Sequence, residues 1–286
     1  MANLKEIRNR IASVSSTMQI TSAMKMVSAA KLKKAQDAIT AMRPYANKLT
    51  ELVQGLSSNL DSDGISAYAD QREIKRTLIV SITSNRGLCG AFNSNIIKEC
   101  ANMIEGEYGD RHVDFMTIGK KAFDVLGKDQ SVVANHGEVF NDLSFENVAK
   151  IAEELMHMYA EGNYDQILLV YNSFKNAATQ IIMKEQFLPI VTAEEETTAA
   201  ADYIFEPSSE GIVMELIPKS LKTQLYKALR DSFASEHGAR MTAMHKATDN
   251  AMELRDELTL NYNKARQAAI TNEILEIVSG AEALNE

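Results

Sequence analysis

The sequence predicts an α/β protein with long helices, in which an antiparallel coiled coil of the two chain ends carries a central Rossmann-like α/β domain as an insert. Apolar residues at both ends repeat in alternating steps of three and four, which is the seam pattern of a coiled coil. Between these ends, apolar strands alternate with helical patterns, as in a largely parallel sheet. Neither apolar stripe is stable in water alone, so the simplest arrangement pairs the two ends.

The N-terminal helix is predicted over residues 1–60. Asn3 followed by Glu6 resembles a helix N-cap with a capping-box carboxylate, and Pro44 inside the pattern predicts a kink. The seam consists of Leu4, Ile7, Ile11, Val14 and Met18, then Leu32, Ala35, Ile39, Met42, Ala46, Leu49, Val53, Leu56 and Leu60.

The first seam is interrupted in its middle. Polar residues stand at Thr21, Lys25 and Ser28, while apolar residues stand beside them at Ile20, Met24 and Val27. We expect the buried face to rotate here. A coiled-coil stutter explains such an interruption, and so does a second protein contacting this stretch, which we favour because charge and methionine gather there.

Residues 61–76 are predicted as a linker and residues 77–207 as the α/β domain. Buried strands are expected at 77–83, 113–118 and 167–171, and a more exposed strand at 180–191. Helices are expected around 96–104 and 119–126, and from a cap at Ser144 to Tyr159. Alternation of these elements favours a parallel sheet with helices packed against it.

The C-terminal helix is predicted over residues 208–286, with a kink at Pro218. Its seam consists of Met244, Ala247, Ala251, Leu254 and Leu258, then Ile270, Ile274, Ile277, Ala281 and Leu284.

Charge is distributed unevenly along the chain. The net charge is −9, yet the first 50 residues carry nine Lys or Arg against two acidic residues. A basic helix on an acidic protein indicates either an acidic partner surface or a solvated helix face. Nucleic acid is not expected as a partner, because the basic stretch lacks interleaved aromatic residues.

No targeting or catalytic pattern is present. Cys89 and Cys100 are the only cysteines, which is typical of a reducing compartment. The longest uncharged run, Ile11 to Met24, is too short and polar to span a bilayer. The five histidines lack metal-ligand spacing, and no acid/base pair stands out, so we expect no catalytic residues, no metal and no cofactor.

The segment from Ser84 to Gly90 lies where a nucleotide-binding loop would lie in an α/β fold. It lacks both the G-x-G-x-x-G pattern and a G-K-[ST] ending. We therefore interpret it as a tight turn in which Gly87 and Gly90 permit positive φ. Cys89 within it is expected to pack rather than react.

Several segments together resemble one family. They are Lys5–Arg8, Ile20–Val27, Ala30–Leu32, Asn85–Gly90, Ala239–Ala251 and Leu260–Glu273. These resemble the gamma subunits of rotary proton-translocating ATP synthases over the whole chain. The family often has Glu where this sequence has Lys25.

The resemblance implies a central rotor stalk that is not an enzyme by itself. In such a complex the paired helices enter the alpha and beta catalytic hexamer, and the α/β domain contacts the epsilon subunit and the c-subunit ring. Rotation driven by protons cycles the beta subunits, which make ATP. The implied location is peripheral, at the cytoplasmic face of the bacterial plasma membrane, with membrane association only through the complex.

The resemblance also implies two sets of contact residues. Those for the alpha and beta hexamer are Met24, Lys25, Lys31, Lys33, Lys34, Arg240, Gln267, Thr271 and Glu273, and those for the c ring are Tyr203 and Glu206. Two alternatives stay open. A stand-alone coiled-coil scaffold would behave as a rod without binding a hexamer, and a small α/β enzyme with helical arms would bind or turn over a ligand.

Overall fold

The computed structural model describes residues 4–57, 68, 72–106, 108–109, 111–190 and 209–283. Two compact units make up the chain: Met1–Ser28 with Met241–Glu286, and Ala29–Arg240. The long helices α1 (Leu4–Ser57) and α6 (Ser209–Ala283) contribute to both units. Each unit is described by itself below.

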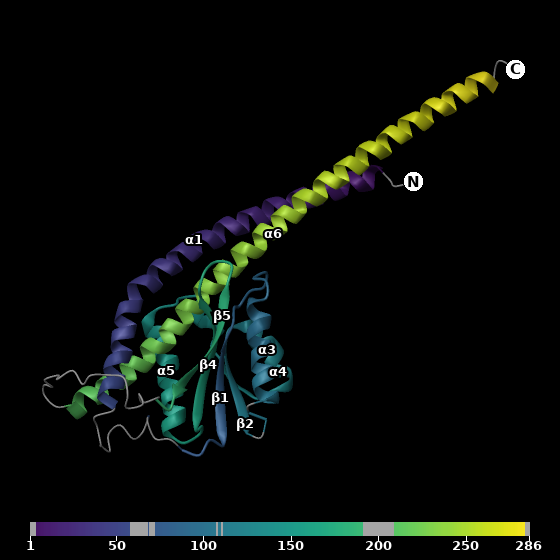
Figure 1. The fold of residues 1–286 in the computed structure, drawn as a ribbon. Helices are drawn as coiled ribbons and strands as arrows, with labels where there is room; N and C mark the ends of the chain where they lie inside the picture. The colour runs from purple at the N-terminus through teal and green to yellow at the C-terminus, as the bar shows by residue number, and fades with distance from the viewer. Residues whose placement is uncertain are drawn as a thin grey trace. The chain divides into compact units, whose positions relative to one another are not determined.

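The larger unit contains a five-stranded sheet with the order β3-β2-β1-β4-β5. Its strands are β1 (Arg76–Ile82), β2 (His112–Ile118), β3 (Val132–Asn135), β4 (Gln166–Phe174) and β5 (Gln180–Leu188). The first four pair in parallel, and β5 pairs antiparallel with β4. The predicted Rossmann-like α/β arrangement is therefore confirmed (Figure 1).

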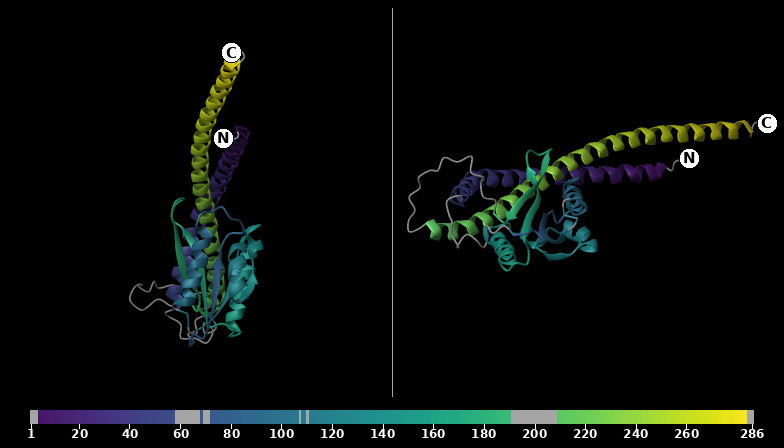
Figure 2. Two further views of the ribbon diagram at one scale, coloured as in Figure 1. Left: turned by 90° about the vertical axis from the view of Figure 1, so that its right-hand side faces the viewer. Right: turned by 60° about the horizontal axis from the view of Figure 1, so that its bottom comes forward.

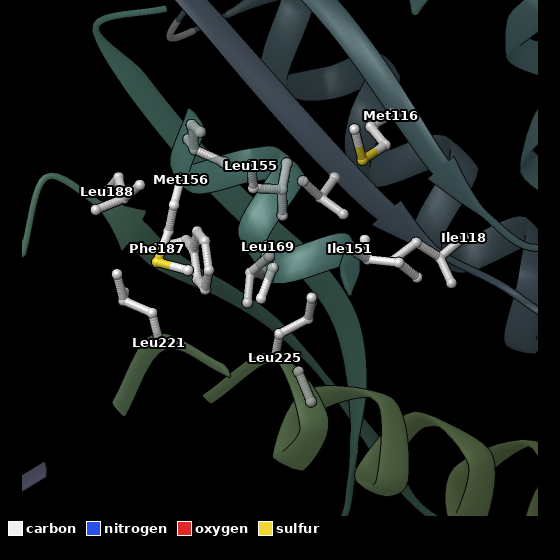
Figure 3. Close-up of a cluster of buried hydrophobic side chains, with 14 of the residues drawn as sticks. Met116, Ile118, Ile151, Leu155, Met156, Leu169, Phe187, Leu188, Leu221 and Leu225 are labelled. Carbon is white, nitrogen blue, oxygen red and sulfur yellow. The ribbon is translucent and has the colours of Figure 1, made fainter. Parts of the chain in front are cut away.

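Helices cover both faces of this sheet. The face that carries Leu78, Val80 and Ile82 packs against α5 (Phe145–Ala160) and residues 217–229 of α6. Figure 3 shows Leu155 of α5 and Leu225 of α6 in this core. The other face packs against α3 (Phe92–Glu105) and α4 (Lys120–Asp129). Burial on both sides explains why β1 is a continuous apolar run.

The start of α5 is capped as expected. Ser144 has extended backbone angles, and its side chain accepts a hydrogen bond from the Asn147 amide. The short strand β3 and the 3₁₀ helix η1 (Gly137–Phe140) were not predicted. Residues of β3 alternate between half-buried and exposed over only four positions, which is too short for a periodicity signal.

In the smaller unit the two chain ends run side by side and antiparallel. The Arg8 guanidinium donates to the Tyr262 hydroxyl at 2.8 Å, and the Thr248 hydroxyl donates to that of Thr21 at 2.8 Å. Both views in Figure 2 show the start of α1 running along the second half of α6, whose last turns extend beyond it. The pairing predicted from the two heptad stripes is confirmed.

The expected rotation of the buried face within α1 is wrong. Thr21 and Ser28 are buried on the seam, whereas Ile20 and Val27 are 60% and 57% exposed. The seam stays in register because these small hydroxyl groups find hydrogen-bond acceptors on their own helix. Thr21 donates to the Met18 carbonyl, and Ser28 Oγ donates to the Met24 carbonyl at 2.8 Å.

The predicted seam of the C-terminal helix is only partly correct. Met244 and Ala251 are buried, but Leu254, Ile270, Ile274 and Ile277 are exposed, Ile277 to 71%. The register of the two helices explains why Ile270, Ile274 and Ile277 are exposed. Arg8 already lies opposite Tyr262, so the described part of α1, which begins at Leu4, ends before it reaches these turns of α6.

The second part of α1 belongs to the larger unit and keeps the same spacing, with Leu32, Ala35, Ile39, Ala46 and Leu49 buried. Pro44 and Pro218 lie inside continuous helices. The expected cap at Asn3 and most of the expected linker lie outside the described residues. The division of the chain at residues 60, 76 and 207 stays a prediction.

Candidate functional site: the loop Ser84–Gly90 and the helix surfaces

The loop from Ser84 to Gly90 follows β1 at the carboxyl edge of the sheet. The Ser84 hydroxyl donates to the Arg86 carbonyl at 2.6 Å, and the Asn93 side chain accepts from the Ser84 amide at 2.9 Å. Of the two glycines expected to have positive φ, Gly90 does, at 58°, and Gly87 does not. Leu88 has positive φ instead, at 62°, and its side chain is 64% exposed.

Arg240 of α6 binds the same loop. Its guanidinium donates to the Gly87 carbonyl at 3.2 and 3.4 Å and to the Arg86 carbonyl at 3.3 Å. The same group pairs with Glu236, one helical turn earlier, at 2.6 Å. Because the guanidinium fork presents several donors in one plane, a single side chain fixes two loop carbonyls and a carboxylate.

Burial is the largest cause of the pKa shifts of the two titratable groups next to Arg240. It raises the pKa of Glu236, although the nearby Arg240 charge opposes the shift. Burial, followed by the charges of Arg240 and Lys31, lowers the pKa of His237 to about 4. The imidazole is therefore neutral at pH 7, and its edge packs against the Phe233 ring.

Two amides at the start of α4 have partners within the chain. The Lys120 amide donates to Asn85 Oδ1 at 2.9 Å, and the Ala122 amide donates to Thr83 Oγ1 at 3.0 Å. An open cleft of about 830 Å³ lies beside them, between α4 and α5. These two amides are therefore not free to bind a phosphate in the cleft.

The structure places the predicted contact residues in three different settings. Lys31, Lys33 and Lys34, here called the basic row, are exposed within about one turn of α1 on different sides of the helix, and Met24 and Lys25 are half-buried. Gln267, Thr271 and Glu273 are exposed on the last turns of α6, whereas Arg240 is buried. Tyr203 and Glu206 lie outside the described residues.

Sequence reasoning missed Leu88, Glu236 and His237 as parts of this site. The spacing of Glu236 and Arg240, four residues apart on a helix, is a usable signal for an ion pair. No local pattern indicates that Arg240 reaches a loop 153 residues earlier. The sequence does not indicate the positive φ of Leu88 either, because a positive φ would be expected at the neighbouring glycines instead.

None of the helices in the described parts of the chain contains a stretch long and apolar enough to span a bilayer. Nor do any three His, Cys, Asp or Glu side chains gather there in a way that would hold a metal ion. Two long helices paired side by side, with exposed apolar side chains beyond the pairing, are features of a stalk subunit within a larger assembly.

Comparisons with known proteins define that assembly. The profile of a family described as ATP synthase matches residues 3–284. An ATP synthase gamma chain of Flavobacterium johnsoniae is 69% identical over 286 residues, all of both chains. One of Christiangramia forsetii is 65% identical over 285 residues, with full coverage of both.

Solved structures agree in fold. A chain of the central stalk and c ring of the Tetrahymena thermophila mitochondrial ATP synthase has a TM-score of 0.59 at 27% identity, and the match covers 80% of this chain and 99% of that one. A chain from the Euglena gracilis mitochondrial ATP synthase has a TM-score of 0.70 at 21% identity, covering 98% and 94%, and shows the fold alone.

The chain belongs to the ATP synthase gamma chain family. Its role is therefore that of the central stalk, and gamma chains are non-catalytic subunits of the complex.

Proposed function

We propose that this chain transmits rotation of a c ring to the catalytic beta subunits through three surfaces: the basic row on α1, the exposed end of α6, and the segment around Tyr203 and Glu206. The observation that carries the proposal is the exposed part of α6. Large apolar side chains at Ile270, Ile274 and Ile277 face outward there. Such a stripe is stable when other subunits enclose it.

The basic row supports an acidic partner surface on the hexamer. Lys31, Lys33 and Lys34 are exposed, and they carry charge opposite to that of the whole chain. Each exposed pair contributes only about 0–1 kcal/mol, so the row acts collectively. Its main effect is on orientation and on the rate of association.

Rotation changes beta subunits only through contacts that differ with angle, because a ligand shifts an equilibrium only by its differential affinity for the two states. The smaller unit is uneven around its axis. Ile20, Met26 and Val27 are exposed on one side, and Thr21 and Ser28 are buried on another. This asymmetry supports a role for Met24, which lies next to Ile20 and Val27 on α1, in reporting rotor angle to beta together with the charge of Lys25.

The remaining partners are proposed from the family. The epsilon subunit would contact the α/β domain, and the c ring would contact Tyr203 and Glu206. The complex would lie at the cytoplasmic face of a bacterial plasma membrane. A Glu206→Lys variant should lower proton pumping per ATP hydrolysed while ATP hydrolysis by the hexamer continues; unchanged pumping would remove Glu206 from the c-ring surface.

Reconstitution tests the central claim. The full chain is mixed with alpha and beta subunits, and formation of an ATP-hydrolysing complex is measured at several salt concentrations. A triple variant with Lys31, Lys33 and Lys34 changed to Glu should associate much more slowly at low salt. The matched control changes Lys98, Lys120 and Lys128, which are exposed on α3 and α4, to Glu.

Equal slowing in the two triple variants would mean that only net charge matters. Failure of the wild-type chain to assemble with the hexamer would favour the alternative, a stand-alone coiled-coil scaffold.

A further inference from the structure

The tip of the loop Ser84–Gly90 combines two features that are costly for a folded chain. Leu88 adopts a left-handed backbone conformation at φ 62°, which is unfavourable for a residue with a branched side chain. Its apolar side chain is also 64% exposed. Residues held in such conformations persist when surrounding contacts fix them, and they concentrate at functional sites.

The contacts that fix this loop all come from buried groups of the same unit. Arg240 is 7% exposed and holds the carbonyls of Arg86 and Gly87, the two residues before Leu88. On the other side, Cys89 is 1% exposed and accepts a hydrogen bond from the Asn93 side chain at 3.2 Å. Leu88 is thus held outward between two anchored neighbours.

Two exposed cations lie near the groups that hold this loop. Arg86 and Lys31 are exposed, and both lie close enough to Glu236 for their charges to favour its ionised form. Lys31 is also one of the three exposed lysines of the basic row on α1. An apolar side chain bordered by cations fits a partner surface with a small apolar socket and acidic groups around it.

We propose that Leu88 is a docking knob that inserts into an apolar socket, bordered by acidic groups, on a subunit of the catalytic hexamer, and that Arg240 is the positioning residue that presents it. The inference rests on the proposed function, because the partner is the same hexamer that the basic row is proposed to contact. It changes the role of Arg240: the guanidinium acts through the loop that it holds rather than by touching the partner.

Two substitutions distinguish the role of Leu88, the docking knob, from that of Arg240, the positioning residue. Leu88→Asn keeps a residue that tolerates positive φ but replaces the apolar side chain by a polar one. Arg240→Lys keeps a cation beside Glu236 but loses the fork that holds two carbonyls. The matched control is Arg230→Lys, because Arg230 is another arginine of α6 that donates to a loop carbonyl, that of Leu143 at 2.8 Å, away from this loop.

The measurement is the equilibrium affinity of the labelled full-length chain for the hexamer of alpha and beta subunits. Leu88→Asn should weaken binding about tenfold, as expected for an apolar side chain that no longer enters a socket. Arg240→Lys should weaken it to a similar extent, and Arg230→Lys should leave it unchanged. The double variant of Leu88 and Arg240 should bind no worse than Leu88→Asn alone.

Additive losses in the double variant would show that Arg240 does not act through Leu88. Unchanged affinity in Leu88→Asn, together with weakened binding in the triple lysine variant, would overturn the knob and leave the basic surface standing. If Leu88→Asn reduced binding of the epsilon subunit instead, the partner would be wrong. No binding by the wild-type chain would contradict the proposed function itself.

Discussion

At the scale of single residues, the backbone conformation at a few positions fixes the edge of the sheet on which the candidate site is built. Gly119 joins β2 to α4 with φ at +125°, and a Cβ atom placed there would lie 2.2 Å from the Thr83 carbonyl oxygen. Thr83 also bonds the Ala122 amide through its side chain. The loop and α4 therefore meet at a position that only glycine fits.

Gly119→Ala should lower the free energy of unfolding of the full chain by about 2–4 kcal/mol, because the new methyl group meets backbone atoms. Gly87→Ala is the control, since nothing lies within 4 Å of its added Cβ. It should change stability by no more than about 0.5 kcal/mol. Urea unfolding followed by circular dichroism measures both, and equal effects would contradict the steric explanation.

The buried imidazole of His237 predicts a loss of stability in acid. Its pKa is about 4 in the folded chain, below the ordinary 6.5, mainly because of burial. The folded state therefore binds fewer protons than the unfolded state between these values. The associated stability is fully present above pH 6.5 and is lost as the pH falls toward 4, by about 3 kcal/mol.

The variant His237→Met should remove that part of the pH dependence. His157→Met is the control, because the His157 side chain is 73% exposed on α5, and this variant should keep the wild-type slope. Unfolding curves between pH 4 and 7 compare the three proteins. A wild-type slope in His237→Met would assign the acid sensitivity to other groups.

At the scale of elements, the pairing of α1 with α6 rests on a seam that tolerates hydroxyl groups. Thr21 and Thr248 bond to each other across the seam, and each is also placed to bond the carbonyl of its preceding helical turn. Polar groups in a coiled-coil seam lower stability but define which residues lie opposite each other. The pair therefore fixes the register of the smaller unit.

Cysteines at Thr21 and Thr248 should form a disulfide under mild oxidation, because the two hydroxyl oxygens are only 2.8 Å apart. The natural cysteines do not interfere, since Cys89 and Cys100 are buried and burial raises the pKa of both thiols, that of Cys100 to about 12. Gel mobility under non-reducing conditions detects the closed loop.

The control pairs cysteine at Thr21 with cysteine at Thr271. Position 271 lies about 35 Å further along α6 at 1.5 Å per residue. Crosslinking of the control pair at a similar rate would mean that the helices slide, and absence of the first crosslink would contradict the register.

At the scale of the whole molecule, the three surfaces of the proposals come from three different segments of the chain. The sheet contributes the anchored loop, the second part of α1 the basic row, and the last turns of α6 the exposed apolar stripe. As an ATP synthase gamma chain, the molecule is a non-catalytic subunit of the complex.

The isolated full chain should therefore bind ATP with no measurable affinity in the micromolar range. The segment Ser84–Gly90 lacks the glycine and lysine pattern of a phosphate loop, and the amides of Lys120 and Ala122 beside it already donate to Asn85 and Thr83. Isothermal calorimetry measures the binding directly, and the catalytic hexamer, titrated in parallel, provides the positive control. Stoichiometric heat from the chain alone would reveal a nucleotide site.

The sequence by itself determined the elements with strong periodicity. Heptad spacing predicted the two long helices and their pairing, and apolar runs predicted β1, β2 and β4, because burial on one stripe or on both faces dictates the local pattern of residue types. The cap at Ser144 also followed from local chemistry. Short β3, half-exposed and without periodicity, did not.

Only the tertiary structure decided which apolar residues are covered and which polar residues are buried. Ile274 and Ile277 fit a heptad as well as Met244 does, yet the described part of α1 ends before it reaches them. Thr21 and Ser28 looked like interruptions, yet hydrogen bonds to carbonyls of their own helix satisfy them within the seam. Arg240 reaches Gly87 because folding brings α6 to the sheet edge. Periodicity records what each segment could bury, whereas the length and register of its partner determine what it does bury.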